Sequence, residues 1–270
     1  MPTSVINGVR LYYERHGDSG EPLVFVHGYT GDISDWKFPL AEFSSDYRIL
    51  VMDLRGHGRS EAPSDRSAYS IVQMVEDVEA LVNEIGFQRY HLVGHSMGGA
   101  IVQEIALRSP QSLLSLTLED TASKFGVDTG DDEMTEWRKK RYALAMSEGL
   151  AAAAALPMPN PPPHMPAERL KEVERRLARL SLDAFVGAMV GLLGWEGTEA
   201  RAAAISAPTL IIYGDIDSPS IIEPSRRLAE LIPNATVSVI PESGHSPQWE
   251  RPDLFNKALR RHLEAHRAAG

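Results

Sequence analysis

The stretch Leu92-Val93-Gly94-His95-Ser96-Met97-Gly98-Gly99-Ala100 changes its hydrophobic period in the middle. Before the serine, residues 90–93 form a short and mostly apolar run, which is typical of a buried strand. After the serine, apolar side chains recur at helical spacing, at Ala100, Ile101, Ile105 and Ala106. The stretch therefore predicts a strand, a sharp turn at Ser96 and a helix.

The predicted turn carries the pattern G-x-S-x-G over residues 94–98. Glycines let two backbone segments pass close together, while a serine at such a turn is held in a strained conformation above the sheet. The first N–H groups of the following helix have no intrahelical acceptor and can bind developing negative charge. Ser96 is therefore a candidate nucleophile. Because the pattern is short, this assignment needs further candidate catalytic residues elsewhere in the chain.

Length and composition bound the possible functions. With 270 residues and 43% hydrophobic residues, the chain can form one large α/β domain or a core with a smaller insertion. It has no cysteine, which excludes disulfides, thiol catalysis and thiolate metal sites. Its 27 basic and 37 acidic residues give a formal charge of −10, which argues against nucleic-acid and anionic-membrane partners.

Targeting signals are not evident in the sequence. Residues 1–8 lack a basic region followed by an apolar core, so we do not interpret them as a secretory signal. The longest apolar stretches, at residues 150–156 and 185–195, are too short to span a bilayer. We therefore expect a cytoplasmic protein.

On both sides of the Ser96 turn, buried-strand runs alternate with helical patterns. Asn7-Gly8 lies between two strand-like runs and predicts a hairpin. Apolar runs typical of covered parallel strands follow at residues 22–26, 47–53, 113–118, 208–214 and 235–240. Helical periods cover residues 70–86, 221–232 and 252–266. The pattern predicts an α/β fold.

Strand signals stop between residues 121 and 205, where the composition turns Ala-rich and then Pro-rich. We interpret residues 121–205 as an inserted helical segment, and residues 1–120 and 206–270 as the core domain. The insertion contains many large apolar side chains, most of which we expect to pack the insertion together. A minority should face Ser96.

Three predicted strand ends carry Ser96, Asp217 and His245 in this order. Loops after successive parallel strands gather at one edge of a sheet, so these side chains can converge. The loop at residues 54–60 also contains charged groups, Arg55 and His57. No partner lies at a recognisable spacing, so we interpret it as a structural loop held by Asp53 and local hydrogen bonds.

With these motifs together, the sequence resembles the α/β-hydrolase superfamily, in particular members with a serine nucleophile and a helical cap after the sixth strand. The resemblance covers almost the whole chain and rests on residues 27–29, 53–60, 94–98, 214–217 and 243–247. It implies a mostly parallel eight-stranded sheet with helices on both faces. It also implies a hydrolase that needs no cofactor.

The resemblance implies a role for each candidate residue. Ser96 would attack an acyl carbonyl, His245 would take its proton, and Asp217 would orient the histidine. The backbone N–H groups of Tyr29 and Met97 would form the oxyanion hole. Three other acids remain open as alternatives to Asp217, namely Asp215, Glu119 and Asp120.

We expect the substrate to be a small, hydrophobic carboxylic ester or lactone. The candidate pocket residues are Tyr29, Trp137, Tyr142, Met146, Phe185, Met189 and Trp249. Serine at residue 96 disfavours the dehalogenase and epoxide hydrolase activities of relatives that have an aspartate there. No metal-ligand cluster or phosphate-binding loop is evident, so we expect no metal.

Two alternative functions use the same triad. One is hydrolysis of a C–C bond, of the meta-cleavage or β-diketone kind, for which relatives usually hold a substrate carboxylate with polar or cationic groups. The sequence does not place the cap arginines Arg138 and Arg141 in the pocket. The other is a ligand sensor that keeps the hydrolase fold and signals through a partner.

Overall fold

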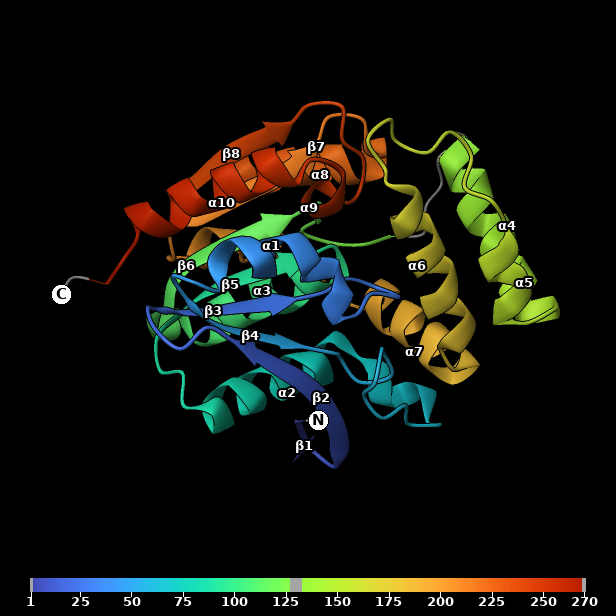
Figure 1. Cartoon of the computed structure of the whole chain (residues 1–270), viewed down its shortest axis with the longest axis horizontal. Helices are drawn as coiled ribbons and strands as arrows, with labels where there is room; N and C mark the ends of the chain where they lie inside the picture. The colour runs from blue at the N-terminus through green and yellow to red at the C-terminus, as the bar shows by residue number, and fades with distance from the viewer. Residues whose placement is uncertain (1, 127–132, 269–270) are drawn as a thin grey trace.

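The computed structural model describes residues 2–126 and 133–268, which are organised around one eight-stranded sheet (Figure 1). The strand order is β1-β2-β4-β3-β5-β6-β7-β8. β2 pairs antiparallel with β1 and β4, and all later neighbours are parallel. The strands are β1 (Thr3–Ile6), β2 (Val9–His16), β3 (Pro22–Val26), β4 (Arg48–Met52), β5 (Tyr90–His95), β6 (Leu113–Glu119), β7 (Thr209–Gly214) and β8 (Ala235–Ile240). The predicted fold class is confirmed.

The chain enters the sheet through the predicted hairpin. Asn7 and Gly8 connect β1 to β2 with φ angles of 48° and 79°. Two consecutive positive φ angles are what a two-residue turn between twisted strands requires. The register then pairs Ile6 with Val9.

Helices cover both faces of the sheet (Figure 1). One face packs against α2 (Ile71–Ile85), α3 (Met97–Arg108) and α8 (Pro219–Leu231), and the other against α1 (Lys37–Phe43) and α10 (Pro252–Ala265). The short helix α9 (Pro247–Glu250) contacts α1 and α10. β3 shows the alternation, because Val24 and Val26 belong to the first core while Phe25 belongs to the second. This double burial explains why the strand is apolar throughout.

The predicted ends of α2 agree with its structure. Ser70 caps the N-terminus in a capping box with Gln73, and Gly86 ends the helix with a φ of 85°. The sequence analysis missed the segment after β3, which contains the 3₁₀ helix η1 (Ile33–Trp36) and then α1. None of the described helices is both long enough and apolar enough to cross a membrane.

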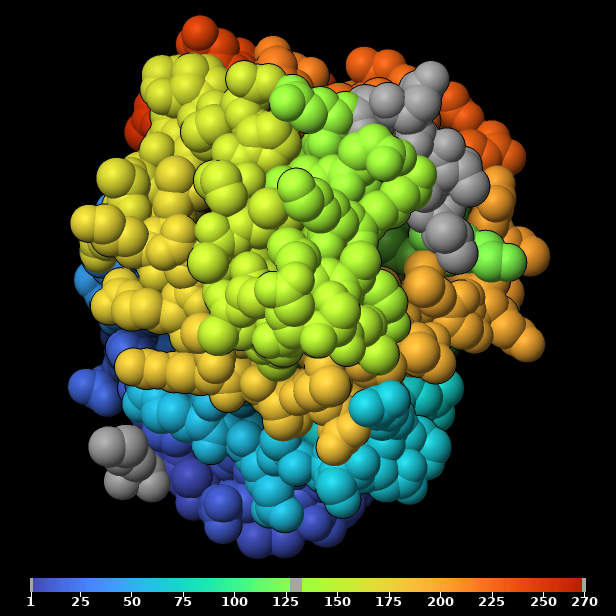
Figure 2. Space-filling model, turned by 90° about the vertical axis from the view of Figure 1, so that its right-hand side faces the viewer, coloured from blue at the N-terminus to red at the C-terminus, as the bar shows by residue number. Residues whose placement is uncertain are grey.

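In the described part of the chain four α-helices lie between β6 and β7, and we call them the cap: α4 (Glu133–Ser147), α5 (Leu150–Ala155), α6 (Ala167–Arg179) and α7 (Leu182–Leu193). They lie beyond one end of the sheet (Figure 1), and Figure 2 shows their atoms across the centre of that face. The cap has a small apolar core of its own that includes Ala145, Leu150 and Leu177. The domain division at residues 120/121 and 205/206 stays a prediction.

Candidate active site

Ser96 lies at the turn between β5 and α3, with φ 53° and ψ −115°. A non-glycine residue rarely adopts a positive φ, and its cost has to be met by the surrounding structure. Two glycines make this turn possible. A Cβ on Gly94 would lie 2.5 Å from the Gly98 carbonyl oxygen, and a Cβ on Gly98 would collide with the Val26 carbonyl oxygen. A side chain at either glycine of the motif would therefore collide with the backbone.

The structure brings together the three side chains that the sequence analysis selected. His245 Nε2 lies 3.1 Å from Ser96 Oγ, and His245 Nδ1 lies 2.6 Å from Asp217 Oδ2. Asp217 follows β7, and His245 lies between β8 and α9. A hydroxyl, an imidazole and a carboxylate therefore form one hydrogen-bonded chain.

The electrostatic environment keeps the carboxylate of this chain ionised. Burial alone would raise the pKa of Asp217, but the His245 ring and the Ser218 backbone N–H together hold that pKa below its ordinary value. The N–H of Ser218 donates to Asp217 Oδ1 at 2.7 Å, leaving Oδ2 for His245. Asp217 can therefore accept a hydrogen bond from the Nδ1–H of His245 and fix the tautomer in which Nε2 is a base.

The alternative acids are placed differently. Asp215 is exposed, and no hydrogen bond joins it to His245 in the described part of the chain. Glu119 is fully buried and accepts from the Gln248 N–H at 3.3 Å. Asp120 is nearer, because one of its carboxylate oxygens lies within 4.8 Å of ligand atoms of Asp217 and His245. It accepts from the Gly214 N–H at 3.1 Å and not from the histidine.

Protonation also separates Asp120 from Asp217. Burial, together with the neighbouring charges of Asp217 and Glu119, raises the pKa of Asp120 well above its ordinary value. Of two neighbouring carboxyl groups, one is thus ionised and bonded to His245 while the other favours its neutral form. Asp120, Asp217 and His245 also form the group among the described residues with a spacing that a metal ion could bridge. In the structure two of these three side chains, His245 and Asp217, are hydrogen-bonded to each other.

The loop that carries His245 is held from two sides, which the sequence analysis did not predict. Glu250 accepts from the N–H groups of Gly244 at 2.5 Å and Ser246 at 3.1 Å. His95 lies 2.7 Å through Nε2 from the backbone oxygen of His245, and burial lowers its pKa to about 3. A neutral His95 therefore donates to this carbonyl and supports the loop.

Tyr29 and Met97, the expected oxyanion-hole residues, flank the serine. Met97 is the first residue of α3, so its N–H has no intrahelical acceptor. A Cβ on Gly28, next to Tyr29, would lie 3.1 Å from the Ser96 Cβ, which places this loop directly against the serine. The Tyr29 hydroxyl donates to the Phe185 carbonyl of α7 at 2.8 Å, and this bond ties the loop to the cap.

Some of the expected pocket residues form a row of aromatic rings. The ring of Phe185 lies 5.5 Å from that of Tyr29 and 5.8 Å from that of Tyr142. Met189 is partly buried on α7. The prediction does not fit Met146, whose side chain is 47% exposed because it lies on the outer side of α4.

The two tryptophans among the expected pocket residues each face an arginine. Trp249 is buried, and the guanidinium of Arg169 from α6 lies 4.9 Å from its ring. Trp137 has the guanidinium of Arg141 at 5.0 Å. Trp249 therefore supports the contact between the cap and the core, while Trp137 packs within the cap.

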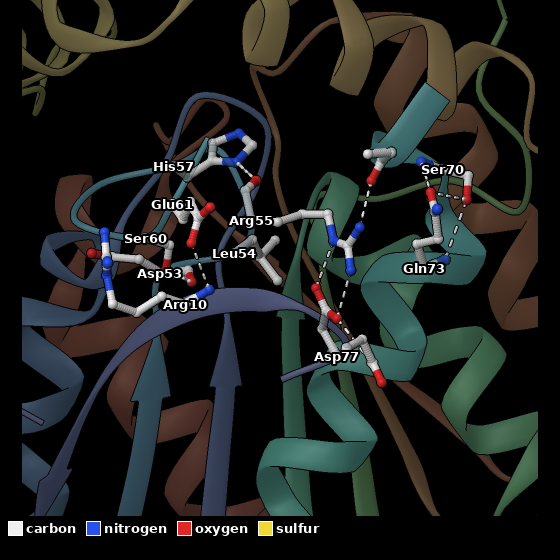
Figure 3. Close-up of polar contacts among 12 residues, drawn as sticks. Arg10, Asp53, Leu54, Arg55, His57, Ser60, Glu61, Ser70, Gln73 and Asp77 are labelled. Carbon is white, nitrogen blue, oxygen red and sulfur yellow. Dashed lines mark hydrogen bonds and ion pairs between the residues drawn. The ribbon is translucent and has the colours of Figure 1, made fainter. Parts of the chain in front are cut away.

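The charged loop after β4 is structural, as we interpreted it (Figure 3). Arg55 makes a bidentate ion pair with Asp77 of α2, at 2.6 and 2.7 Å, and both groups are buried. Its third bond goes to the Ala68 carbonyl. His57 lies 2.9 Å from the Arg55 carbonyl, and Asp53 accepts from the N–H of Ile33 at 2.8 Å.

A second buried ion cluster joins the cap to the core, and the sequence analysis missed it. Asp35 of η1 lies 2.7 Å from Arg169 and 2.5 Å from Arg176, both on α6. Arg176 also contacts Asp32 at 3.2 Å. The two arginines hold the pKa of Asp35 below its ordinary range although burial opposes this. Arg169 and Arg176 are seven residues apart, two helical turns, so both face the core.

Known proteins are similar to this chain in sequence and in fold. Residues 23–258 match the model of the α/β-hydrolase family. The chain is 32% identical to the dihydrolipoyllysine-residue acetyltransferase component of the acetoin cleaving system of Cupriavidus necator, over 96% of this chain and 67% of that protein. It is 31% identical to a Variovorax paradoxus protein provisionally named as a carbamate hydrolase, over 92% of this chain and 94% of that protein.

A solved structure with the same architecture is that of the enol-lactonase from Burkholderia xenovorans LB400. The two structures superpose with a TM-score of 0.83 at 25% sequence identity, over 97% of this chain and 100% of the enol-lactonase.

Proposed function

Because the chain belongs to the α/β-hydrolase family, we propose that it is a serine hydrolase that cleaves a small carboxylic ester or lactone through an acyl-enzyme intermediate. The observation that carries this proposal is the chain of contacts from Ser96 Oγ to His245 Nε2, and from His245 Nδ1 to Asp217. The strained backbone of Ser96 adds to it, since such strain is typical of a nucleophile exposed at a turn.

In the proposed reaction Ser96 Oγ attacks the acyl carbonyl carbon while its proton moves to His245 Nε2. The 3.1 Å separation of these atoms is within hydrogen-bond reach. The imidazolium is stabilised by Asp217, and its proton then passes to the departing alkoxide, which leaves as the alcohol. A water molecule, deprotonated by the same histidine, hydrolyses the acyl-serine and releases the acid.

The tetrahedral oxyanion would accept hydrogen bonds from the N–H groups of Tyr29 and Met97. Removing one such donor in a related site costs about 2.7 to 4 kcal/mol of transition-state stabilisation. Because the donors belong to the backbone, their positions depend on the loops that hold them. The bond from the Tyr29 hydroxyl to the cap therefore gives the cap a direct influence on the oxyanion hole.

The names of the three relatives described above support reaction at a carbonyl carbon. An acetyltransferase component, a carbamate hydrolase and an enol-lactonase are named for acyl, carbamoyl and lactone groups. The aromatic row of Tyr29, Phe185 and Tyr142 supplies apolar surface at the base of the cap. Both features fit a small ester or lactone whose acyl part is largely apolar.

The proposal is tested by steady-state hydrolysis of aryl esters and lactones with the whole protein and with Ser96→Ala. We expect Ser96→Ala to lose turnover by several orders of magnitude while its unfolding transition and its binding of the ester stay unchanged. Substantial turnover by the variant would remove Ser96 from the nucleophile's role. Absence of ester and lactone turnover by the unaltered protein would refute the substrate class.

A further inference from the structure

The two peptide units whose N–H groups are expected to bind the oxyanion are held in the same way. One peptide unit joins Gly28 to Tyr29, and the other joins Ser96 to Met97. Neither N–H donates to an acceptor in the described part of the chain. The carbonyl oxygen of each unit, in contrast, accepts two hydrogen bonds. The groups that fix these carbonyls therefore decide where the N–H groups point.

Thr121, just after β6, holds the second of these peptide units. Its hydroxyl donates to the Ser96 carbonyl oxygen at 2.7 Å, which is a favourable distance for an O–H donor. The helical bond that the same oxygen accepts from the Ala100 N–H is long, at 3.3 Å. Thr121 is 1% exposed, so water does not compete for this contact. The threonine hydroxyl is therefore the better of the two donors on this carbonyl.

The start of α3 is shaped to admit the threonine side chain. A Cβ on Gly99 would collide with both Oγ1 and Cβ of Thr121. Gly99 lies one residue beyond the G-x-S-x-G motif, so the motif does not account for it. A side chain at residue 99 would push the hydroxyl away from the Ser96 carbonyl. The missing side chain of Gly99 thus makes room for the contact.

The first peptide unit shows the same arrangement with a different side chain. His27 Nδ1 lies 2.8 Å from the Gly28 carbonyl oxygen, and the Leu54 N–H donates to Nε2 of the same ring at 3.0 Å. Because Nε2 accepts, Nδ1 carries the proton and donates to the carbonyl. The Gly31 N–H supplies the second bond to this oxygen, at 3.0 Å. A buried side chain thus fixes the carbonyl of each oxyanion peptide.

A peptide unit transmits this support from its oxygen to its nitrogen. The unit is planar and trans, so its C=O and N–H bonds point in opposite directions. The described residues contain no cis peptide bond. A hydrogen bond on the carbonyl therefore sets the direction of the N–H. It also polarises the unit and strengthens the hydrogen bond that the N–H donates. Both effects act on the transition state, in which the oxyanion forms.

We propose that Thr121 is a positioning residue of the oxyanion hole, whose hydroxyl orients and polarises the peptide unit between Ser96 and Met97 so that the Met97 N–H points at the developing oxyanion. The proposal rests on the proposed function and adds to it a residue outside the triad. Thr121 acts through the backbone and does not touch the substrate. A side-chain substitution cannot delete a backbone donor, but at Thr121 it can weaken one.

Three variants separate this role from general support of the fold. Thr121→Val nearly keeps the shape of the side chain but removes the hydroxyl, while the Ser96 carbonyl keeps its bond from Ala100. Thr121→Ser restores the hydroxyl. Ser225→Ala is the matched control, because the buried Ser225 hydroxyl of α8 donates to the Thr121 carbonyl at the same 2.7 Å. This control loosens the same segment but leaves both oxyanion peptides intact.

Steady-state hydrolysis of 4-nitrophenyl butyrate gives the first readout. We expect Thr121→Val to lower kcat by about 5- to 20-fold at nearly unchanged KM, less than the roughly 10²- to 10³-fold that follows loss of a whole oxyanion donor. Thr121→Ser and Ser225→Ala should keep kcat close to that of the unaltered protein. Urea unfolding should show similar losses of stability for Thr121→Val and Ser225→Ala, since each removes one buried hydrogen bond. Equal losses of kcat in these two variants would overturn the proposal.

Labelling of Ser96 by a fluorophosphonate tests the proposal without ester turnover. As Ser96 Oγ displaces fluoride from phosphorus, the phosphoryl oxygen gains negative charge and should bind the same N–H groups. We expect Thr121→Val to lower the second-order rate constant of labelling, followed by intact mass, and Ser225→Ala to leave it unchanged. Equal rate constants for Thr121→Val and the unaltered protein would overturn the role of Thr121 alone. An unreactive Ser96 in the unaltered protein would instead refute the proposed function, and this inference with it.

Discussion

The buried ion cluster between the cap and the core gives a quantitative prediction for Asp35→Asn. The carboxylate of Asp35 is the shared partner of Arg169 and Arg176, at 2.7 and 2.5 Å, and the Asp35 side chain is 2% exposed. With the charge removed, Arg176 keeps Asp32 at 3.2 Å, but Arg169 loses its carboxylate partner. Breaking a buried pair by removing one partner costs about 3 to 5 kcal/mol, so we expect this loss in the free energy of unfolding.

An exposed ion pair between the neighbouring helix α1 and the same cap helix α6 offers a matched control. Lys37 of α1 and Glu168 of α6 also join the core to the cap, at 2.9 Å, but their side chains are 49% and 64% exposed. Exposed pairs contribute about 0 to 1 kcal/mol, so Glu168→Gln should have little effect. Urea unfolding followed by circular dichroism measures both variants.

The reasoning also predicts a partial rescue. Arg169→Met in the Asp35→Asn background removes the stranded charge and should recover part of the lost stability, because a buried pair replaced by apolar groups is often neutral. If Asp35→Asn and Glu168→Gln destabilise the protein equally, the argument from burial is refuted.

Two further predictions concern the triad and the pH dependence of stability. Asp217→Asn should lower kcat for esters by about 10³- to 10⁴-fold, because His245 would adopt the wrong tautomer. Asp215→Asn, at an exposed position, should keep a kcat near that of the unaltered protein. Equal effects of the two variants in steady-state assays would refute Asp217 as the acid of the triad. Burial lowers the pKa of His262 to about 4, against about 6.5 in an unfolded chain. The neutral ring thus contributes stability that is fully present above about pH 6.5 and is lost as pH falls towards 4, about 2 kcal/mol of it by pH 5. His262→Gln, which cannot titrate, should flatten this acid limb in urea unfolding at pH 5 and 7.5, and an unchanged limb would contradict the argument.

The fold was predictable because its signals are local. The period change at Ser96, the Asn7-Gly8 turn and the apolar parallel strands each reside in a few neighbouring residues. The three candidate triad residues were also visible, since each follows a strand and parallel strands bring their ends to one edge. The structure places their side chains in hydrogen-bond contact.

Other features depend on residues far apart in the sequence. Arg176 forms an ion pair with Asp35, which lies 141 positions away in the sequence, and no sequence pattern around either residue indicates its partner. In the cap, composition indicated which side chains are large and apolar, but not which way they point. The sequence could not show that Met146 is exposed or that Trp249 faces Arg169.

Labelling of the nucleophile tests the central claim most directly. The intact protein is treated with an organophosphonate, its mass is measured, the modified peptide is mapped, and aryl-ester turnover is followed in parallel. The account predicts one adduct on Ser96, loss of turnover in proportion to labelling, and neither adduct nor turnover in Ser96→Ala. An unlabelled Ser96, or ester turnover that survives in Ser96→Ala, would contradict it.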